Sequence, residues 1–150
     1  MSDGIDVRKY SGTRPAIRHR TALIVEDDES IRDTLTGLLE DEGFEVMTAS
    51  TLGRAHYVLF ESRHPVGVVV LDLGMPDGDG ETLVEALYAR DAKSIPVVVL
   101  SAMTERASKL AARFSLQFLS KPFDVAMVAA MVLVAFENDV RPHLAGRRAR

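Results

Sequence analysis

The sequence contains no cysteine, which excludes a disulfide framework and thiol chemistry and fits a reducing compartment. It also lacks a long apolar run. The longest, residues 125–136, has 12 residues, whereas a helix that crosses a bilayer needs about 20. The N-terminus shows no charged-then-apolar signal pattern. We therefore expect a cytoplasmic protein with no membrane segment.

Several familiar motifs are missing as well. The chain has no GxxxxGK[ST] loop of the kind that cradles phosphates, and its four histidines have no metal-binding spacing. The DGDG turn at residues 77–80 resembles a calcium loop only in part, because the ligand spacing and the closing glutamate are wrong. These absences argue against a P-loop nucleotide site, a histidine metal site and a calcium loop.

Positive charge is scarce in the middle of the chain and concentrated at its two ends. Residues 1–20 carry five basic and two acidic side chains, and residues 141–150 carry four arginines and no acid. Residues 21–140 carry nine basic and 20 acidic side chains. An acidic domain disfavours contact with nucleic acid phosphates. We therefore expect no direct DNA binding, a flexible basic leader at 1–20, one folded domain at 21–140 and a solvated basic tail at 141–150.

Within the acidic middle part, short apolar stretches alternate with amphipathic ones. The apolar stretches predict strands at 21–25, 44–49, 66–71, 95–100 and 116–120, and the amphipathic ones predict helices at 29–43, 50–64, 80–91 and 104–114. The longer apolar segment after the last strand predicts a fifth helix at 123–139. Thr104 and Asp124 are the predicted N-caps of the last two helices. The strand at 66–71 is apolar throughout, and unbroken apolar strands need cover on both faces of their sheet, as in parallel sheets. We predict an α/β fold with a doubly wound, five-stranded parallel sheet and five helices.

Polar residues follow four of these strands, at the point where each strand ends. They are Glu26, Asp27 and Asp28 after 21–25, Asp72 after 66–71, Ser101 after 95–100, and Lys121 after 116–120. Ligands of open parallel sheets bind beyond the carboxyl ends of the strands, so these side chains are expected to converge. Each alone suggests only a turn or a helix cap, which is the plain interpretation of Asp28 and Asp124. Their occurrence together favours a functional site.

The residue types of this group predict a phosphoryl-accepting site. Clustered carboxylates raise one another's pKa unless a cation joins them. Oxygen ligands without histidine or cysteine favour Mg²⁺ over zinc. A lysine beside them is suited to hold a phosphoryl group. Together they suggest transfer of a phosphoryl group to a carboxylate, with a metal neutralising its oxygens.

Four segments carry a resemblance to a known family. LIVEDDESIR, VVVLDLGMPDGDG, VVVLSA and FLSKPF resemble the response-regulator receiver domains of two-component signalling, the CheY-like superfamily, over about residues 21–137. The resemblance implies a flavodoxin-like fold with strand order 2-1-3-4-5. It implies that Asp72 is the phosphoacceptor, that Asp27 binds Mg²⁺ directly and Glu26 through water, and that the backbone carbonyl of Gly74 completes the metal site.

The resemblance also implies a switch. Lys121 would contact the phosphoryl group, Ser101 would turn toward it, and Phe118 would change rotamer with Ser101. The bond between Lys121 and Pro122 is commonly cis in this family. The phosphoryl donor would be a sensor histidine kinase or a phosphotransfer protein, and self-hydrolysis would reset the switch. Activation would alter the surface of the last two helices and the strand between them, which would contact a downstream protein.

Two features depart from the family pattern. Lys121 follows Ser101 by 20 residues, about two fewer than expected, and the usual small Gly-Ala element before the last strand is replaced by RFSLQF. We therefore expect the helix at 104–114 or its exit loop to be shortened or irregular. The last helix contains VAMVAAMVLVAF, which is apolar on all sides. We expect it to form a partner or homodimer face.

The chain offers 29 residues after Lys121, enough for one helix and a basic tail. On this count we predict a stand-alone receiver that shuttles phosphate or acts by protein contact, the alternative being an excised part of a longer regulator. A phosphatase with an aspartate nucleophile would need a second acid two residues after it, where this chain has Gly74. A receiver-like scaffold that works without phosphorylation is the third possibility.

Overall fold

The computed structural model describes residues 19–62, 64–90 and 95–138. Its centre is a five-stranded sheet with the order β2-β1-β3-β6-β7, in which every neighbouring pair is parallel. The strands are β1 (Thr21–Val25), β2 (Glu45–Ala49), β3 (Val68–Asp72), β6 (Val97–Ser101) and β7 (Gln117–Ser120). Counted along the chain, this is the order 2-1-3-4-5, so the predicted doubly wound parallel sheet is confirmed.

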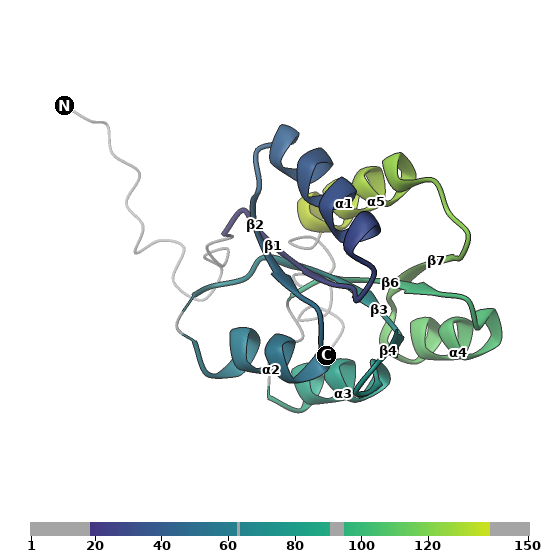
Figure 1. The fold of residues 1–150 in the computed structure, drawn as a ribbon. Coiled ribbons are helices and arrows are strands. Elements are labelled where there is room, and N and C mark those ends of the chain that lie inside the picture. The colour runs from purple at the N-terminus through teal and green to yellow at the C-terminus, as the bar shows by residue number, and fades with distance from the viewer. Residues whose placement is uncertain (1–18, 63, 91–94, 139–150) are drawn as a thin grey trace, which may run out of the picture.

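Five helices cover the two faces of this sheet (Figure 1). They are α1 (Glu29–Asp41), α2 (Leu52–Phe60), α3 (Glu81–Ala89), α4 (Thr104–Phe114) and α5 (Val125–Asn138). Helices α1 and α5 lie together on one face, while α2, α3 and α4 lie on the other. Among the described residues, no helix is long and apolar enough to cross a bilayer.

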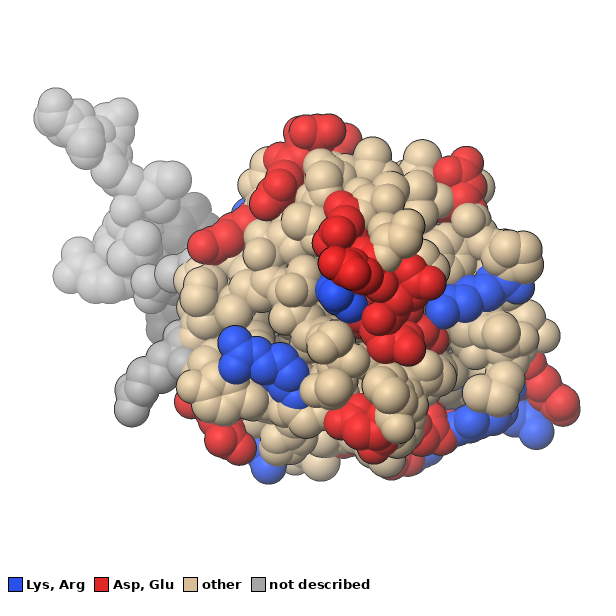
Figure 2. Space-filling model, viewed as in Figure 1, with Lys and Arg blue, Asp and Glu red and all other residues tan. Residues whose placement is uncertain are grey.

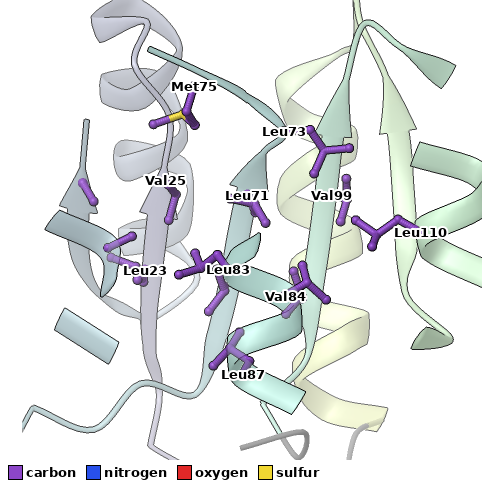
Figure 3. Close-up of a cluster of buried hydrophobic side chains, with 14 of the residues drawn as sticks. Leu23, Val25, Leu71, Leu73, Met75, Leu83, Val84, Leu87, Val99 and Leu110 are labelled. Atoms are coloured by element: carbon purple, nitrogen blue, oxygen red, sulfur yellow. The ribbon is translucent and has the colours of Figure 1, made fainter. Parts of the chain in front are cut away.

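Side chains along the buried strands point alternately to the two faces of the sheet, so the domain has two separate hydrophobic cores. Every residue of β1, β3 and β6 is buried. In β1, Leu23 and Val25 point into the core under α2, α3 and α4, whereas Ala22 and Ile24 point into the core under α1 and α5. Figure 3 shows the first of these cores. Leucines of α3 and Leu110 of α4 pack against the strand residues from the helix side. The apolar strands thus need helices on both faces, as the sequence predicted.

Two of the three helix caps named in the sequence analysis are confirmed. The Asp28 carboxylate accepts a hydrogen bond from the Ile31 N–H at 3.0 Å and caps α1, and the Asp124 carboxylate accepts one from Ala126 at the start of α5. The prediction that Thr104 caps α4 was wrong. Thr104 is already the first residue of the helix, so Met103 is the N-cap residue, and it makes no side-chain cap bond. The Ser101 hydroxyl accepts the N–H of Met103, which precedes the helix.

The predicted irregularity near α4 lies only at its exit. Helix α4 itself has 11 regular residues, and it ends at Ser115, which adopts a left-handed conformation with a φ of 59°. The next residue donates its N–H to the Ala111 carbonyl at 2.8 Å, and β7 begins immediately afterwards. A left-handed residue reverses the chain within a single position, which explains how the shorter connection still reaches the sheet.

A small hairpin that the sequence did not predict follows β3. Strands β4 (Gly74–Met75) and β5 (Gly78–Asp79) pair antiparallel. Met75 is buried and packs into the core shown in Figure 3. The chain directly after Asp72 is therefore a fixed element rather than a free loop.

The structure describes little of the two terminal segments that the sequence predicted. Most of the predicted leader and the predicted basic tail, residues 1–18 and 141–150, lie outside the described residues, so those assignments stay predictions. Arg20, which we assigned to the leader, is described. Its guanidinium donates to the Glu42 carbonyl at 2.8 Å and lies over the rings of Phe44 and Phe136.

Candidate functional site

The carboxyl ends of β1, β3, β6 and β7 meet at one edge of the sheet and surround a recess of about 270 Å³. Its walls are Glu26, Asp27, Asp28, Ile31, Asp72, Gly74, Ser101, Ala102, Met103 and Lys121. Acidic side chains gather at the centre of this face of the molecule (Figure 2). The parallel sheet therefore brings together almost all of the site residues that the sequence predicted.

Asp72 is the last residue of β3 and is 3% exposed. One carboxylate oxygen, Oδ2, accepts a hydrogen bond from the Lys121 ammonium at 2.8 Å, and the other, Oδ1, accepts one from the Gly74 N–H at 3.0 Å. Burial alone would lower the pKa of Lys121, but the hydrogen bond and charge of Asp72, together with the charges of Glu26 and Asp27, raise this pKa above its usual value. The lysine is therefore a permanent cation beside a buried carboxylate.

Glu26 is fully buried, and one of its oxygens is left without a hydrogen bond. Oε2 accepts the Asp28 N–H at 3.1 Å, whereas Oε1 has no hydrogen-bond partner and lies 3.6 Å from the Lys121 ammonium. Burial raises the pKa of Glu26 to about 7; the Asp28 N–H opposes the rise, and the charge of Asp72 adds to it. A buried carboxylate oxygen without a hydrogen bond is a costly arrangement that a bound cation would relieve.

Glu26, Asp27 and Asp72 form a cluster of metal-ligand type. One oxygen from each lies within 4.8 Å of the others, and Asp27 is exposed while the other two are buried. The donors are all carboxylate oxygens, which suit a hard cation such as Mg²⁺. With the orphaned Glu26 oxygen, this donor set fits the predicted metal. Gly74 lines the same recess, next to Asp72.

Ser101 is the last residue of β6 and is bound to its own loop. Its hydroxyl oxygen accepts the Met103 N–H at 2.9 Å, and the hydroxyl can donate to the Met103 carbonyl at 3.3 Å. Phe118 is the one predicted site residue that is not among the described walls of the recess. It is partly buried on β7 and packs against the core under α4. Its predicted part in the switch stays a prediction.

Arg32 is a supporting residue that the sequence analysis missed. Its guanidinium, in the first turns of α1, donates to the Glu26 carbonyl at 2.9 Å and to the Asp27 carbonyl at 3.3 Å. These bonds fix the backbone that carries both acids. The only signal in the sequence is an arginine one helical turn beyond Asp28, which is too common on helix surfaces to be informative.

Comparisons with known proteins agree with this geometry. The family profile of the response regulator receiver domain matches residues 22–133. The chain belongs to this family. A receiver domain is the regulatory switch of a two-component response regulator, and the acidic recess described above is typical of the family.

Similar proteins include two transcriptional regulators. The KDP operon transcriptional regulatory protein KdpE of Escherichia coli is 40% identical over 118 residues, which cover 77% of this chain and 51% of that protein. The virulence transcriptional regulatory protein PhoP of Salmonella typhimurium is 34% identical over 110 residues, which cover 72% of this chain and 48% of that protein. The chain thus spans about half the length of these curated relatives.

Solved structures show the same architecture. The solution structure of the beryllofluoride-activated NtrC4 receiver domain dimer has a TM-score of 0.69 and 33% sequence identity, and the match covers 80% of this chain and 98% of that one. The described residues therefore share the fold of a solved receiver domain.

Proposed function

We propose that this protein accepts a phosphoryl group on Asp72 from the phosphohistidine of a sensor kinase or a phosphotransfer protein, in a reaction that needs Mg²⁺. The observation that carries the proposal is the position of Asp72. Its buried carboxylate contacts the Lys121 ammonium at 2.8 Å and belongs to a cluster of acids around a recess open to solvent. The cytoplasmic location stays a prediction of the sequence.

The chemistry follows from the charges around the incoming group. An Asp72 oxygen attacks the phosphorus atom, a new oxygen–phosphorus bond forms, and the bond from phosphorus to the histidine nitrogen breaks. Lys121 stabilises the charge on the phosphoryl oxygens. Glu26, Asp27 and Asp72, with Gly74 beside them, would hold Mg²⁺, which neutralises negative charge on the phosphoryl group when bound. The Gly74 N–H keeps the Asp72 carboxylate oriented.

The switch is proposed to start at Ser101. To reach a phosphoryl oxygen on Asp72, the Ser101 hydroxyl must leave the Met103 N–H that it accepts in this structure. Movement of the loop after β6 then alters the packing near Phe118, in line with the family resemblance. Hydrolysis of the acyl phosphate restores the arrangement described above.

An apolar recess beside the acidic one suits the phosphoryl donor. It has a volume of about 480 Å³ and is lined by Ile31, Ala102, Lys121, Pro122, Phe123 and Val125. A donor protein must place its phosphohistidine over Asp72. The donor residues around that histidine would then contact the apolar recess. We infer that the partner presents apolar side chains around its phosphohistidine.

The receiver is proposed to signal through protein contacts. The acidic domain disfavours DNA phosphates, and the expectation of no direct DNA contact stays a prediction, since the curated relatives are named transcriptional regulators and are about twice the matched length. We also propose that the outer face of α5 packs against a second copy. Met127 and Val134 are 53% and 47% exposed on that face, and one similar receiver structure is described as a dimer.

Intact-protein mass spectrometry tests the proposal. We expect incubation with acetyl phosphate to add one phosphoryl group when Mg²⁺ is present and none when it is chelated. The Asp72→Asn variant, which keeps the side-chain size, is expected to gain none under either condition. Absence of an adduct on the unmodified protein with Mg²⁺ would contradict the proposal and favour a scaffold that works without phosphorylation.

A further inference from the structure

Arg106 joins helix α4 to the hairpin that follows the phosphoacceptor. It lies in the first turn of α4, and its terminal nitrogen Nη2 donates to Asp79 Oδ2 and to Glu81 Oε2, the latter at 3.2 Å. Asp79 belongs to β5, and Glu81 is the first residue of α3. We call these contacts the Arg106 bridge. No resemblance or comparison described above gives them a role.

On one side, the bridge ends on a fixed element. Asp79 Oδ1 accepts the Glu81 N–H at 3.0 Å, and Asp79 is the pairing partner of Gly74 in the hairpin. Gly74 in turn donates to Asp72, and the buried Met75 anchors the hairpin in the core. The carboxylates that Arg106 contacts therefore cannot easily follow a movement of α4.

On its other side, the bridge contacts the loop that holds the switch hydroxyl. Arg106 Nη1 lies 3.9 Å from the Met103 sulfur. The Met103 N–H donates to Ser101, and the Met103 carbonyl accepts the Ala107 N–H of α4 at 3.1 Å. Met103 is thus connected both to Ser101 and to the helical turn that carries Arg106. If the Ser101 hydroxyl no longer accepts the Met103 N–H, Met103 and the first turn of α4 lose one of the contacts that hold them in place.

We propose that Arg106 is a positioning residue that holds the loop between β6 and α4 in the arrangement in which Ser101 is bound to Met103, and so opposes the phosphorylated arrangement. The inference rests on the function proposed above. Hydrogen bonds between a guanidinium and a carboxylate weaken steeply with distance and angle. A shift of Met103 and the first turn of α4 away from the fixed hairpin would therefore weaken the bridge.

The expected effect is modest because the bridge is partly open to solvent. The side chains of Arg106, Asp79 and Glu81 are 41%, 37% and 29% exposed. Ion pairs of this kind contribute little to stability, so their loss should change an affinity by about two- to fivefold. The direction of the change is more informative than its size. Loss of a contact specific to the resting arrangement should weaken the fold and tighten the binding of a phosphoryl analogue.

The test uses Arg106→Gln with Arg113→Gln as its matched control. Arg113 lies in the last turn of the same helix and donates to Glu85 of α3 at 3.0 Å, far along α4 from the switch loop. Beryllofluoride is titrated into the full chain at saturating Mg²⁺ by calorimetry, and thermal unfolding is measured without ligand. We expect Arg106→Gln to bind the analogue about two- to fivefold more tightly while unfolding at a lower temperature.

The control variant distinguishes a positioning role of Arg106 from a general loss of stability in α4. Arg113→Gln is expected to lower the unfolding temperature without changing the affinity for beryllofluoride. Arg106→Lys keeps the positive charge but loses the planar guanidinium group that contacts two carboxylates at once. Its affinity for beryllofluoride is expected to lie between those of the unmodified protein and Arg106→Gln. Equal or weaker binding by Arg106→Gln, or equally tightened binding by Arg113→Gln, would overturn the inference alone. Failure of the unmodified protein to bind beryllofluoride would instead overturn the proposed function and this inference with it.

Discussion

At the scale of single residues, burial determines the chemistry of the site. Asp72 and Glu26 are carboxyl groups at 3% and 0% exposure, and the nearest cation is the Lys121 ammonium, 2.8 Å from one and 3.6 Å from the other. One positive charge thus faces two buried acids. Burial, reinforced by the charge of Asp72, raises the pKa of Glu26. The shortage of positive charge also makes the site suitable for a divalent cation.

The raised pKa of Glu26 predicts a pH-dependent stability in the absence of divalent cations. Its pKa rises from 4.5 to about 7 on folding, so between these values the folded protein binds more protons than the unfolded one. The free energy of unfolding should therefore fall as the pH rises through this window, by up to about 3 kcal/mol. Urea unfolding at pH 5, 6, 7 and 8, in the presence of a chelator that removes divalent cations, measures this dependence of the free energy of unfolding on pH.

The control for this prediction is Glu26→Gln, which cannot ionise. We expect the variant to lose this part of the pH dependence and to be more stable than the unmodified protein at pH 8. Added Mg²⁺ should stabilise the unmodified protein at pH 8 more than the variant. If the two proteins show the same slope with pH, then burial of Glu26 does not have the effect that we assign to it.

At the scale of elements, the sequence predicted the strands and helices because their patterns are strong. Apolar strands between capped amphipathic helices leave few alternatives. The hairpin β4–β5 was missed because each strand has two residues, too few for a periodic pattern. The cap of α4 was assigned one residue too late, because the helix already begins at Thr104 and Met103 is its N-cap residue. Hydrophobic periodicity does not fix a helix end to a single residue.

Two glycines test how tightly the elements pack, one beside Asp72, the proposed phosphoacceptor, and one in α1. A methyl group on Gly80, at the start of α3, would lie 3.0 Å from the Asp72 carbonyl oxygen and 3.0 Å from the Leu73 Cα atom, whereas one on Gly37 in α1 would have no neighbour within 4 Å. We expect Gly80→Ala to destabilise the protein by about 1–3 kcal/mol. Gly37→Ala should stabilise it by about 0.5–1 kcal/mol.

Chemical denaturation of both variants measures these free energies. Gly80→Ala should also reduce the rate of phosphorylation by acetyl phosphate, because the Asp72 backbone has to move, whereas Gly37→Ala should leave the rate unchanged. A Gly80→Ala protein with unaltered stability and rate would show that the packing at the end of β3 is looser than described.

At the scale of the whole molecule, the sheet topology assembles the site. Glu26, Asp72, Ser101 and Lys121 are far apart in sequence, and parallel strands place them at one edge. The sequence predicted this convergence because strand ends were recognisable. It could not predict which side chains bind one another, such as Ser101 with Met103 or Arg106 with Asp79. Those pairings depend on loop conformations and on distances between helices.

The outer face of α5 yields a prediction about assembly. The expected apolar surface is present: Val128, Val132 and Phe136 are buried, while Met127 and Val134 remain 53% and 47% exposed. We expect the protein with beryllofluoride and Mg²⁺ to have twice the mass of the monomer in light scattering after size exclusion. The double variant Met127→Glu with Val134→Glu should remain a monomer, because it places charge on the outer face that the dimer would bury.

The matched control is Tyr57→Glu, which changes a residue that is 45% exposed on α2, the helix on the opposite face of the sheet from α5 (Figure 1). This variant is expected to dimerise as the unmodified protein does. A monomer under all conditions would contradict the homodimer proposal and leave the α5 face to a different partner.

The central claim is that Asp72 receives the phosphoryl group, and chemical mapping tests it most directly. The protein is phosphorylated with acetyl phosphate and Mg²⁺, the acyl phosphate is reduced with borohydride, and the peptides are sequenced by mass spectrometry. The account predicts one modified residue, at Asp72, whose conversion to homoserine requires both reagents. Modification at another acid of the cluster, such as Asp27 or Glu26, or at none, would contradict it.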